Sequence, residues 1–381
     1  MQSWSVKTDV YYGQGALDRL ASISNKRVLV VTDSFMTTSG TADKVASHLT
    51  NCEVKIFDKV VPDPPINVVS EGVKCLHEFG TEFIVALGGG SSIDSAKAIR
   101  TIAQESVGSK ASDIPLVAIP TTSGTGSEVT NYAVISNPEK GAKYPLSGDH
   151  LLASEAILDP ELTLSVPPAI TADTGLDALT HAIEAYVSTG AGDFTDAWCE
   201  KAVQLIFEYL PSAFRGGDTP EAVKAREKMS NAATLAGLAF NIAGLGVNHG
   251  IAHAVGARFH LPHGRACQLL LAPVMAFNAD LGNVRNGEYS VAAQKYAHLA
   301  KVLGFSSASI RIGASNMIRE VDRLCRTVGE PATLRQCGVD SAEARVSIPE
   351  LAAKAVVDPT TSTNPRPISE EQVVEILKKL V

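Results

Sequence analysis

Basic clusters and long apolar runs are absent from this sequence. Its 381 residues hold 33 Lys and Arg against 41 Asp and Glu, a formal net charge of −8. Because no basic block is interleaved with aromatic residues, we expect no nucleic-acid partner. No run of about 18 or more apolar residues occurs, and the first residues show no signal-peptide pattern. We therefore expect a cytoplasmic protein that has no membrane partner.

Cysteine pairs with Cys-X-X-Cys spacing are also missing. The six cysteines are Cys52, Cys75, Cys199, Cys267, Cys325 and Cys337. Their scatter indicates buried or incidental thiols in a reducing compartment. It argues against a disulfide framework and against a cysteine zinc site. Aromatic residues make up 6% of the chain and charged residues 19%, as in a soluble enzyme. At this length two domains are the default expectation.

The first part of the chain alternates strand and helix patterns. Strands are expected at 28–32, 53–57, 83–87 and 115–122, and helices at 41–49 and 66–79. The strands are continuous apolar runs, which is typical of parallel strands covered on both faces. Repeated βα units with short connections predict an α/β, doubly wound domain over residues 1–165.

From Val166 onward, strand patterns fade and helical periodicity takes over. Helices are expected at 177–187, 196–210, 221–243, 250–259, 266–278, 290–303, 314–327 and 370–380. These segments are rich in alanine and leucine, and no internal repeat or low-complexity linker separates them. The sequence therefore predicts an all-helical second domain over residues 166–381.

A glycine-rich loop follows the strand predicted at 83–87. Gly88, Gly89, Gly90, Ser91 and Ser92 lead from that strand into a helical stretch. Glycines let backbone N–H groups approach a phosphate, and the helix N-terminus adds its dipole. The alternative is an ordinary glycine-rich turn, because the loop is not a Gly-X-Gly-X-X-Gly motif.

Two further features extend this nucleotide hypothesis. Asp33 follows the strand at 28–32, where a carboxylate can accept hydrogen bonds from a ribose 2′-hydroxyl and repel a 2′-phosphate. An N-cap or turn role is the alternative for Asp33. The segment PTTSGTGSEVT, Pro120–Thr130, supplies many small donors, although a Thr/Ser-rich turn would look the same. Two such loops in one α/β half favour a dinucleotide.

Histidines are concentrated between Asn248 and Gly264. This segment holds His249, His253, His260 and His263, and Asp177 and His181 lie upstream in LDALTH. His249 and His253 are four residues apart, and so are Asp177 and His181. On a helix, each such pair projects from one face. Any one of these histidines is more often a surface or core residue, but the set indicates a divalent metal site.

These motifs together resemble a known family. GGGSSIDSAKAI, PTTSGTGSEVT, AILDPEL, TGLDALTHAIEAY and NHGIAHAVGARFHLPHG resemble, in order and spacing, the motifs of the iron-dependent (group III) alcohol dehydrogenases. The resemblance runs essentially end to end. It implies an α/β dinucleotide-binding domain, an all-helical metal-binding domain as in dehydroquinate synthase-like proteins, and an active site between them.

The resemblance also implies roles for individual residues. Four metal ligands fall on Asp177, His181, His249 and His263, whereas His253 matches an active-site histidine thought to relay protons. Cofactor-binding positions carry over to Asp33, Gly89, Gly90, Ser91, Ser92, Asp94, Thr121, Thr122, Thr125 and Lys143. His260 matches no ligand position and is expected to be a polar surface or cleft residue.

YYGQGAL, GAKYPL and STNPRP look most like family members that interconvert propionaldehyde and 1-propanol in the microcompartments of propanediol-utilising bacteria. The resemblance thus implies an NAD(H)-dependent enzyme for a short-chain aldehyde and primary alcohol. Fe(II) is the implied metal, and Zn(II) is the alternative because three imidazoles and a carboxylate fit both. We further expect a homo-oligomer, a dimer or larger, in the cytoplasm or inside a microcompartment with shell or enzyme partners.

Two rival functions stay open from the sequence. A zinc-dependent polyol dehydrogenase of the glycerol type, or a dehydroquinate synthase-like enzyme, would have related motifs, and metal analysis would separate them. A catalytically idle microcompartment interaction protein belongs to a different class. The intact ligand and phosphate-loop motifs disfavour an idle protein, and a metallohydrolase would not need two nucleotide loops.

Overall fold

The structure is a computed structural model that describes residues 5–106, 114–137, 142–284 and 288–381. The contacts divide the chain into two compact units. The first comprises Met1–Val166 and Gly217–Gly237, and the second comprises Pro167–Gly216 and Leu238–Val381. The N-terminal part of α7 (Pro220–Ala243) therefore belongs to the first unit, although the sequence suggested a single boundary near Val166.

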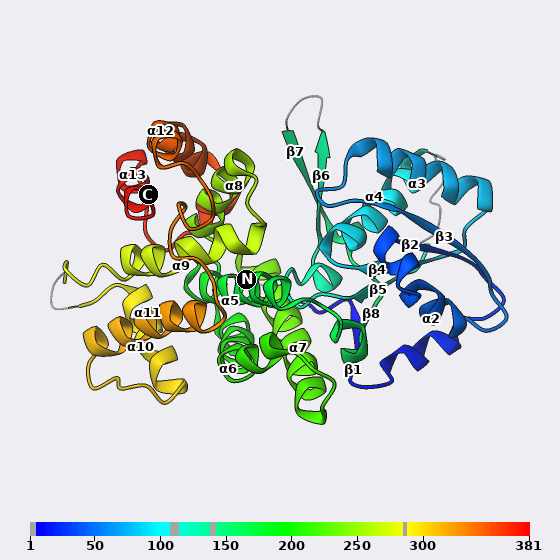
Figure 1. The fold of residues 1–381 in the computed structure, drawn as a ribbon, viewed down its shortest axis with the longest axis horizontal. Coiled ribbons are helices and arrows are strands. Elements are labelled where there is room, and N and C mark those ends of the chain that lie inside the picture. Colours follow the sequence, from blue (N-terminus) through cyan, green and yellow to red (C-terminus); the bar gives the residue numbers. More distant parts are fainter. Residues whose placement is uncertain (1–4, 107–113, 138–141, 285–287) are drawn as a thin grey trace. The chain divides into compact units, whose positions relative to one another are not determined.

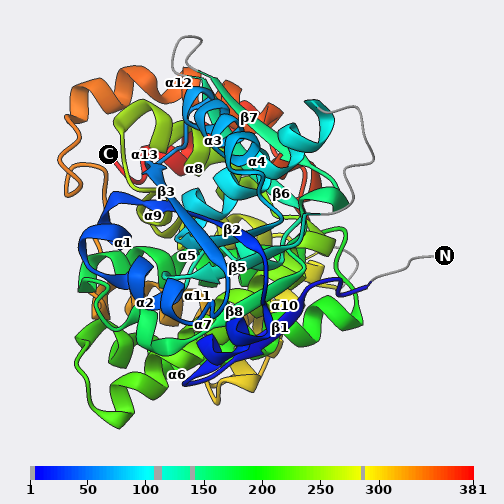
Figure 2. The same ribbon diagram turned by 90° about the vertical axis from the view of Figure 1, so that its right-hand side faces the viewer.

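A six-stranded parallel sheet forms the centre of the first unit (Figures 1 and 2). Its strand order is β1 (Asp9–Tyr12), β8 (Glu155–Leu158), β5 (Leu116–Pro120), β4 (Phe83–Gly88), β2 (Arg27–Asp33) and β3 (Glu53–Val60). All five pairings are parallel. The four strands expected from apolar runs are present. The sequence missed β1 and β8, because four residues are too few for a clear pattern.

Side chains of the central strands alternate between two cores, as the period of a strand requires. Val28 and Val30 of β2 pack with residues of η1 (Ala16–Ser22) and α2 (Thr41–Ser47). Leu29 and Val31 pack with α3 (Ile66–Phe79) and α4 (Gly90–Ser106) on the opposite face. Fully burying each such side chain contributes about 1.5–3 kcal/mol. Both faces of the sheet are thus covered, which confirms the doubly wound α/β prediction.

The first unit also contains several smaller elements. A two-stranded antiparallel ribbon is formed by β6 (Tyr132–Asn137) and β7 (Ala142–Ser147). The short segments are α1 (Ser34–Thr38), η2 (Ser127–Val129), η4 (Asp149–Leu151) and η5 (Pro160–Thr163).

The second unit is helical, which confirms the predicted fold class. Its helices are α5 (Pro168–Val187), α6 (Asp193–Arg215), α8 (Val247–Phe259), α9 (His263–Ala279), α10 (Val291–Val302), α11 (Ile310–Thr327), α12 (Ser341–Val357) and α13 (Glu370–Lys378), with η6 (Pro359–Thr363) between the last two. The sequence did not predict α12, which contains Pro349 and has a weak apolar stripe. Buried side chains of α8, α9, α12 and α13 form one core, and Figure 1 shows α8, α12 and α13 close together.

No single helix in the described ranges is long and apolar enough to cross a membrane. Only α7 and α8 taken together have the necessary length and composition, and a bend of 108° separates them.

Candidate functional site

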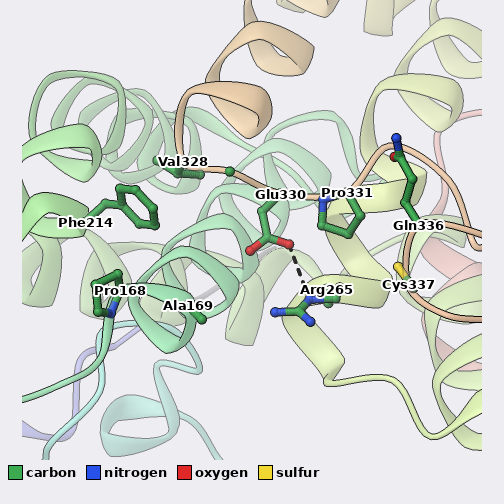
Figure 3. A pocket seen from close by; sticks show the side chains of 10 residues that line it. Pro168, Ala169, Phe214, Arg265, Val328, Glu330, Pro331, Gln336 and Cys337 are labelled. Atoms are coloured by element: carbon green, nitrogen blue, oxygen red, sulfur yellow. Dashed lines mark ion pairs between the residues drawn. The ribbon is translucent and has the colours of Figure 1, made fainter.

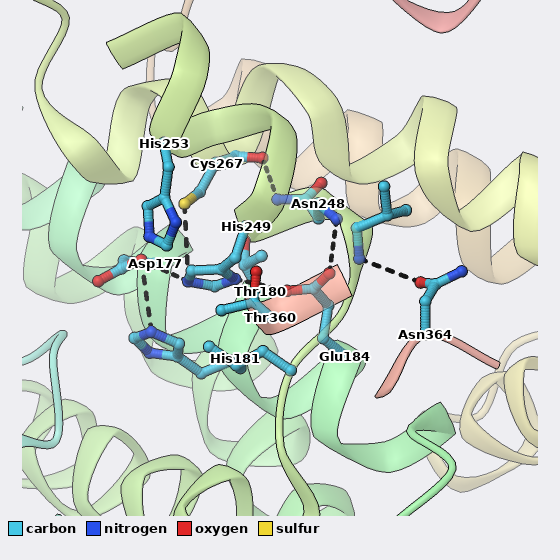
Figure 4. A network of polar contacts seen from close by, with 12 residues as sticks. Asp177, Thr180, His181, Glu184, Asn248, His249, His253, Cys267, Thr360 and Asn364 are labelled. Carbon is cyan, nitrogen blue, oxygen red and sulfur yellow. Dashed lines mark hydrogen bonds and ion pairs between the residues drawn. The ribbon is translucent and has the colours of Figure 1, made fainter. Parts of the chain in front are cut away.

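Four polar side chains converge in the second unit. Asp177 and His181 project from α5, His249 projects from α8, and His263 is the first residue of α9. Their candidate ligand atoms all lie within 4.8 Å of one another. Figure 4 shows the rings of His181 and His249 directed at Asp177. The structure therefore brings together the four residues that the family resemblance implied as metal ligands.

The geometry around Asp177 tests whether a cation fits. Its Oδ1 lies 3.8 Å from His181 Nε2, 3.9 Å from His249 Nε2 and 3.5 Å from His263 Nε2. Bonds of about 2.0–2.2 Å in a tetrahedral shell separate neighbouring ligand atoms by roughly 3.4 Å. Among the described residues, Asp177 Oδ1 is buried without a hydrogen-bond partner, which is costly unless something else compensates it. The donor set therefore fits a divalent metal such as Fe(II) or Zn(II).

His249 is held by a carboxylate on its far side. Its Nδ1 is hydrogen-bonded to Glu184, one turn beyond His181 on α5, and Glu184 Oε1 accepts from the backbone N–H of Asn248 at 2.7 Å. Burial and the neighbouring histidines lower the pKa of His249 well below its ordinary value, so its ring is neutral, as a metal ligand must be. Burial also raises the pKa of Glu184 to about 8. A cation held by His249 Nε2 would favour the ionised form of Glu184, which would then accept from Nδ1–H and orient the ring.

His253 lies one turn after His249 on α8, and its side chain is 43% exposed. Its ring stacks on that of His263, with 5.5 Å between ring centroids. Its Nδ1 lies 2.9 Å from Asp358 Oδ2. Burial opposes ionisation of Asp358, but hydrogen bonds from His253 and Thr360 outweigh it and lower the pKa of Asp358 to about 2. His260 ends α8 in a left-handed conformation and lies outside the cluster.

Cys267 is a neighbour of the cluster to which sequence reasoning assigned no role there. Its Sγ lies 3.8 Å from His249 Nε2 and 3.6 Å from His263 Nε2. Burial raises the pKa of this thiol well above its ordinary value, which keeps it protonated. Its position one turn after His263 on α9 was the available signal, because residues four apart share a helix face.

In the first unit, the sheet reverses its strand order between β2 and β4. From β2 the chain proceeds to β3 on one side, and from β4 it proceeds to β5 on the other. Ligands of open α/β sheets bind outside the carboxyl ends of the strands at this kind of position. Asp33 ends β2 and Gly88 ends β4, and a Cβ atom on Gly88 would lie 3.5 Å from Asp33 Oδ2. Asp33 Oδ1 caps α1 by accepting from Phe35 N and Met36 N, so the N-cap role holds and Oδ2 faces the glycine loop.

The two predicted phosphate loops lie against each other. A Cβ atom on Gly89 would lie 3.3 Å from Thr122 Oγ1, and one on Gly90 would lie 2.8 Å from Thr125 Cγ2. Thr121 N donates to the carbonyl oxygen of Gly88 at 3.0 Å. Ser91 and Ser92 occupy the first turn of α4, where the helix dipole favours an anion. The backbone N–H of Ser92 donates to the carbonyl oxygen of Gly89 at 3.0 Å. The structure thus gathers most of the predicted cofactor residues at the N-terminus of α4.

Asp94, on α4, is hydrogen-bonded to the second predicted loop and to β6. Its Oδ1 accepts from Ser127 Oγ at 2.6 Å, and its Oδ2 accepts from Val134 N at 2.9 Å. Lys97, which the sequence did not single out, donates to the carbonyl oxygens of Thr130 and Tyr132 at 2.8 Å each. Burial lowers the pKa of Lys97 to about 8. Both side chains therefore brace the loop, and direct contact of Asp94 with a cofactor stays a prediction. The side chain of Lys143 lies outside the described residues.

A pocket of about 680 Å³ lies elsewhere in the second unit (Figure 3). Apolar side chains including Pro168, Phe214 and Val328 line it. Its polar wall holds Arg265 and Glu330, whose Nε and Oε2 atoms lie 3.4 Å apart. Burial raises the pKa of Glu330 to about 7. Within the described part of the chain, no predicted metal ligand lines this pocket.

Two family models match the chain. One, described as iron-containing alcohol dehydrogenase, matches residues 7–160. The other, described as Fe-containing alcohol dehydrogenase family, C-terminal, matches residues 171–381. Together they span residues of both structural units, including the two predicted phosphate loops and the histidine cluster.

Individual relatives agree with these models. The chain is 44% identical to a 1-propanol dehydrogenase, PduQ, of Salmonella typhimurium, with 100% of both chains covered. It is 43% identical to the protein of the same name from Citrobacter freundii, again over 100% of both. Among solved structures, that of a 1,3-propanediol oxidoreductase covers 100% of both chains at 32% identity with a TM-score of 0.88.

Proposed function

This chain belongs to the iron-containing alcohol dehydrogenase family, and we propose that it reduces propionaldehyde to 1-propanol with NADH. The balanced reaction is propionaldehyde + NADH + H⁺ → 1-propanol + NAD⁺. The family makes it an oxidoreductase. The likeness to two 1-propanol dehydrogenases over the whole length supports the choice of substrate.

One observation carries the catalytic part of the proposal. A buried carboxylate oxygen on Asp177 has three imidazole Nε2 atoms 3.5–3.9 Å away and, within the described residues, no hydrogen bond of its own. This constellation is costly without a cation and favourable with one. We propose that Asp177, His181, His249 and His263 hold Fe(II), with Zn(II) as the rival metal.

Different residues of this chain then have different roles in the proposed reaction. A divalent metal supplies Lewis acidity, which polarises a carbonyl oxygen and lowers the pKa of an alcohol. The four ligand side chains fix where the substrate oxygen binds. His253, exposed beside His263, exchanges the proton of the alcohol with solvent. A nicotinamide cofactor, when held by the residues around the glycine-rich loop, would supply or accept the hydride.

The first unit supports NAD(H) as the cofactor. Anion-binding N–H groups at the start of α4 face the carboxyl ends of the strands, and a diphosphate fits such a site. Asp33 Oδ2, beside Gly88, is available to accept from a ribose 2′-hydroxyl, and its charge disfavours a 2′-phosphate. Homo-oligomerisation and residence in a microcompartment stay predictions from the family resemblance.

Elemental analysis of anaerobically purified protein tests the proposal, together with NADH oxidation in the presence of propionaldehyde. One iron per chain and fast turnover are expected. Zinc together with activity on a polyol would instead indicate the glycerol-type dehydrogenase. Absence of metal and of turnover after reconstitution with Fe(II) would reject the function. As a control, His263→Ala should lose bound metal and activity together, whereas the exposed His260→Ala should keep both.

A further inference from the structure

Asp358 connects a structural turn with the predicted proton-relay histidine. It follows the last residue of α12 and is the N-cap of η6. Its Oδ1 accepts from the backbone N–H of Thr360 at 2.9 Å and from Thr360 Oγ1 at 2.6 Å. Its Oδ2 lies 2.9 Å from His253 Nδ1. One carboxylate oxygen is therefore hydrogen-bonded to the turn, and the other is hydrogen-bonded to the imidazole.

Close backbone packing holds Asp358 against α8. A Cβ atom on Gly250 would lie 2.9 Å from the carbonyl oxygen of Ala355 and 3.4 Å from Asp358 Cβ. Gly250 is three residues before His253, so it lies on the same helix face. Because it has no side chain, the Asp358 turn can approach this face. The contact between Asp358 and His253 is thus determined by the backbone of two elements.

An ionised carboxylate has only acceptor sites. The nitrogen of His253 that faces Asp358 must therefore carry a hydrogen, and a neutral imidazole then has its lone pair on the other nitrogen. We propose that Asp358 is a positioning residue that keeps His253 in the tautomer with Nδ1–H and an unprotonated Nε2. In alcohol oxidation this Nε2 accepts the alcohol proton and releases it to solvent. Throughout, Nδ1 keeps its hydrogen and donates it in a hydrogen bond to Asp358. This inference rests on the proposed function, in which His253 handles that proton.

Asp358→Asn separates this role from a structural one. The two donors of Thr360 hold the oxygen of the introduced amide on the side of the turn, and asparagine caps as well as aspartate. The amide NH₂ then faces His253 Nδ1, which must become an acceptor, so the hydrogen moves to Nε2. We expect kcat for 1-propanol oxidation to fall about tenfold or more. KM values, metal content and melting temperature should stay near those of the wild type.

A double-mutant comparison identifies the route of the effect. In a His253→Ala background, Asp358→Asn should cause no further loss of kcat, because the residue through which it acts is gone. Asp340 is a matched control, since it caps α12 through Ala342 N and Glu343 N. Asp340→Asn should leave kcat unchanged. Unchanged kcat in Asp358→Asn, or losses that multiply with those of His253→Ala, would overturn the inference.

The tautomer itself can be observed without turnover. In ¹⁵N-histidine spectra of the zinc-loaded protein, the signals that disappear in His253→Ala belong to that ring. They should report Nδ1–H in the wild type and Nε2–H in Asp358→Asn. A wild-type ring already protonated on Nε2 would refute the inference. A normal rate in His253→Ala would instead refute the relay step of the proposed function, and the spectrum would still decide the tautomer.

Discussion

Gly264 lies directly against the backbone of Asp173, so closely that a Cβ atom on Gly264 would overlap the Asp173 carbonyl oxygen. Gly264 follows His263 at the start of α9, and Asp173 lies one turn before Asp177 on α5. The ion pair of Arg265 with Asp173, at 3.0 Å, fastens the same crossing. The spacing of two predicted ligands therefore depends on one missing side chain.

We expect Gly264→Ala to push α9 away from α5 and to separate His263 from Asp177. Overpacking of this kind costs about 1–3 kcal/mol of stability. Metal content of the purified protein and its melting temperature should both fall. Gly256→Ala in α8 is the control, because the nearest atom to its new Cβ would be 3.5 Å away. Full metal occupancy in Gly264→Ala would contradict this account of the crossing.

These relationships mark the limit of sequence reasoning. Spacing of four residues correctly places Asp177 with His181, and His249 with His253, on helices. It cannot show that α5, α8 and α9 meet. The approach of α9 to α5 depends on the absence of a side chain at Gly264. Family resemblance supplied the remaining ligand, and contacts such as Glu184 with His249 or Asp358 with His253 join residues far apart in the chain.

Strand prediction succeeded where strands are buried on both faces and failed at the short strands. The valine-rich β2 and β4 are continuous apolar runs, whereas the edge strand β1 has four residues that are exposed or half-buried. Asp33 shows a different limit. The carboxylate caps α1 with one oxygen and directs the other to the glycine-rich loop, so the N-cap role does not exclude the proposed ribose contact.

Glu184→Gln should weaken metal binding while leaving the fold intact. The backbone N–H of Asn248 keeps the amide oxygen, so the amide NH₂ faces His249 Nδ1. Nδ1 must then act as an acceptor, so the ring hydrogen moves to Nε2. A protonated Nε2 cannot bind a metal. Loss of such an outer carboxylate costs about 10–100-fold in metal affinity. Competition with a chelator measures this change.

Glu200→Gln is the matched control for Glu184. Glu200 also contacts a histidine, His298, at 3.2 Å, but this pair lies on α6 and α10 outside the cluster. Its metal affinity should equal that of the wild type. Equal affinities for all three proteins would show that Glu184 does not orient His249.

Asp33→Ser should relax the choice of cofactor. Serine caps a helix about as well as aspartate, so α1 should persist. The mutation removes the charge that faces the glycine loop and the acceptor proposed for a ribose hydroxyl. A hydrogen bond to a charged group contributes about 1.5–3 kcal/mol, so kcat/KM with NADH should fall at least tenfold. With NADPH it should rise, and an unchanged NADH/NADPH ratio would reject the proposed role of Asp33.

Glu330 should make stability depend on pH. Its pKa in the folded protein is about 7 because of burial, against 4.5 in an unfolded chain. Between these values the folded state binds more protons, so the free energy of unfolding decreases as pH rises from about 4.5 to 7. Above pH 7 the folded protein holds a buried carboxylate whose Oε2 has no hydrogen-bond partner among the described residues. The cation beside it is Arg265, which also binds Asp173 and is therefore shared between two carboxylates.

We therefore expect Glu330→Gln to stabilise the protein at pH 8 and to have little effect at pH 5. One pKa unit corresponds to about 1.4 kcal/mol, and because Arg265 already offsets part of the charge we expect a gain of about 1–2 kcal/mol. Thermal melting at both pH values measures the difference. Glu53→Gln, at an exposed position on β3, should change neither melting temperature. If Glu330→Gln melted below the wild type at pH 8, the carboxylate would be stabilising Arg265 more than its burial costs.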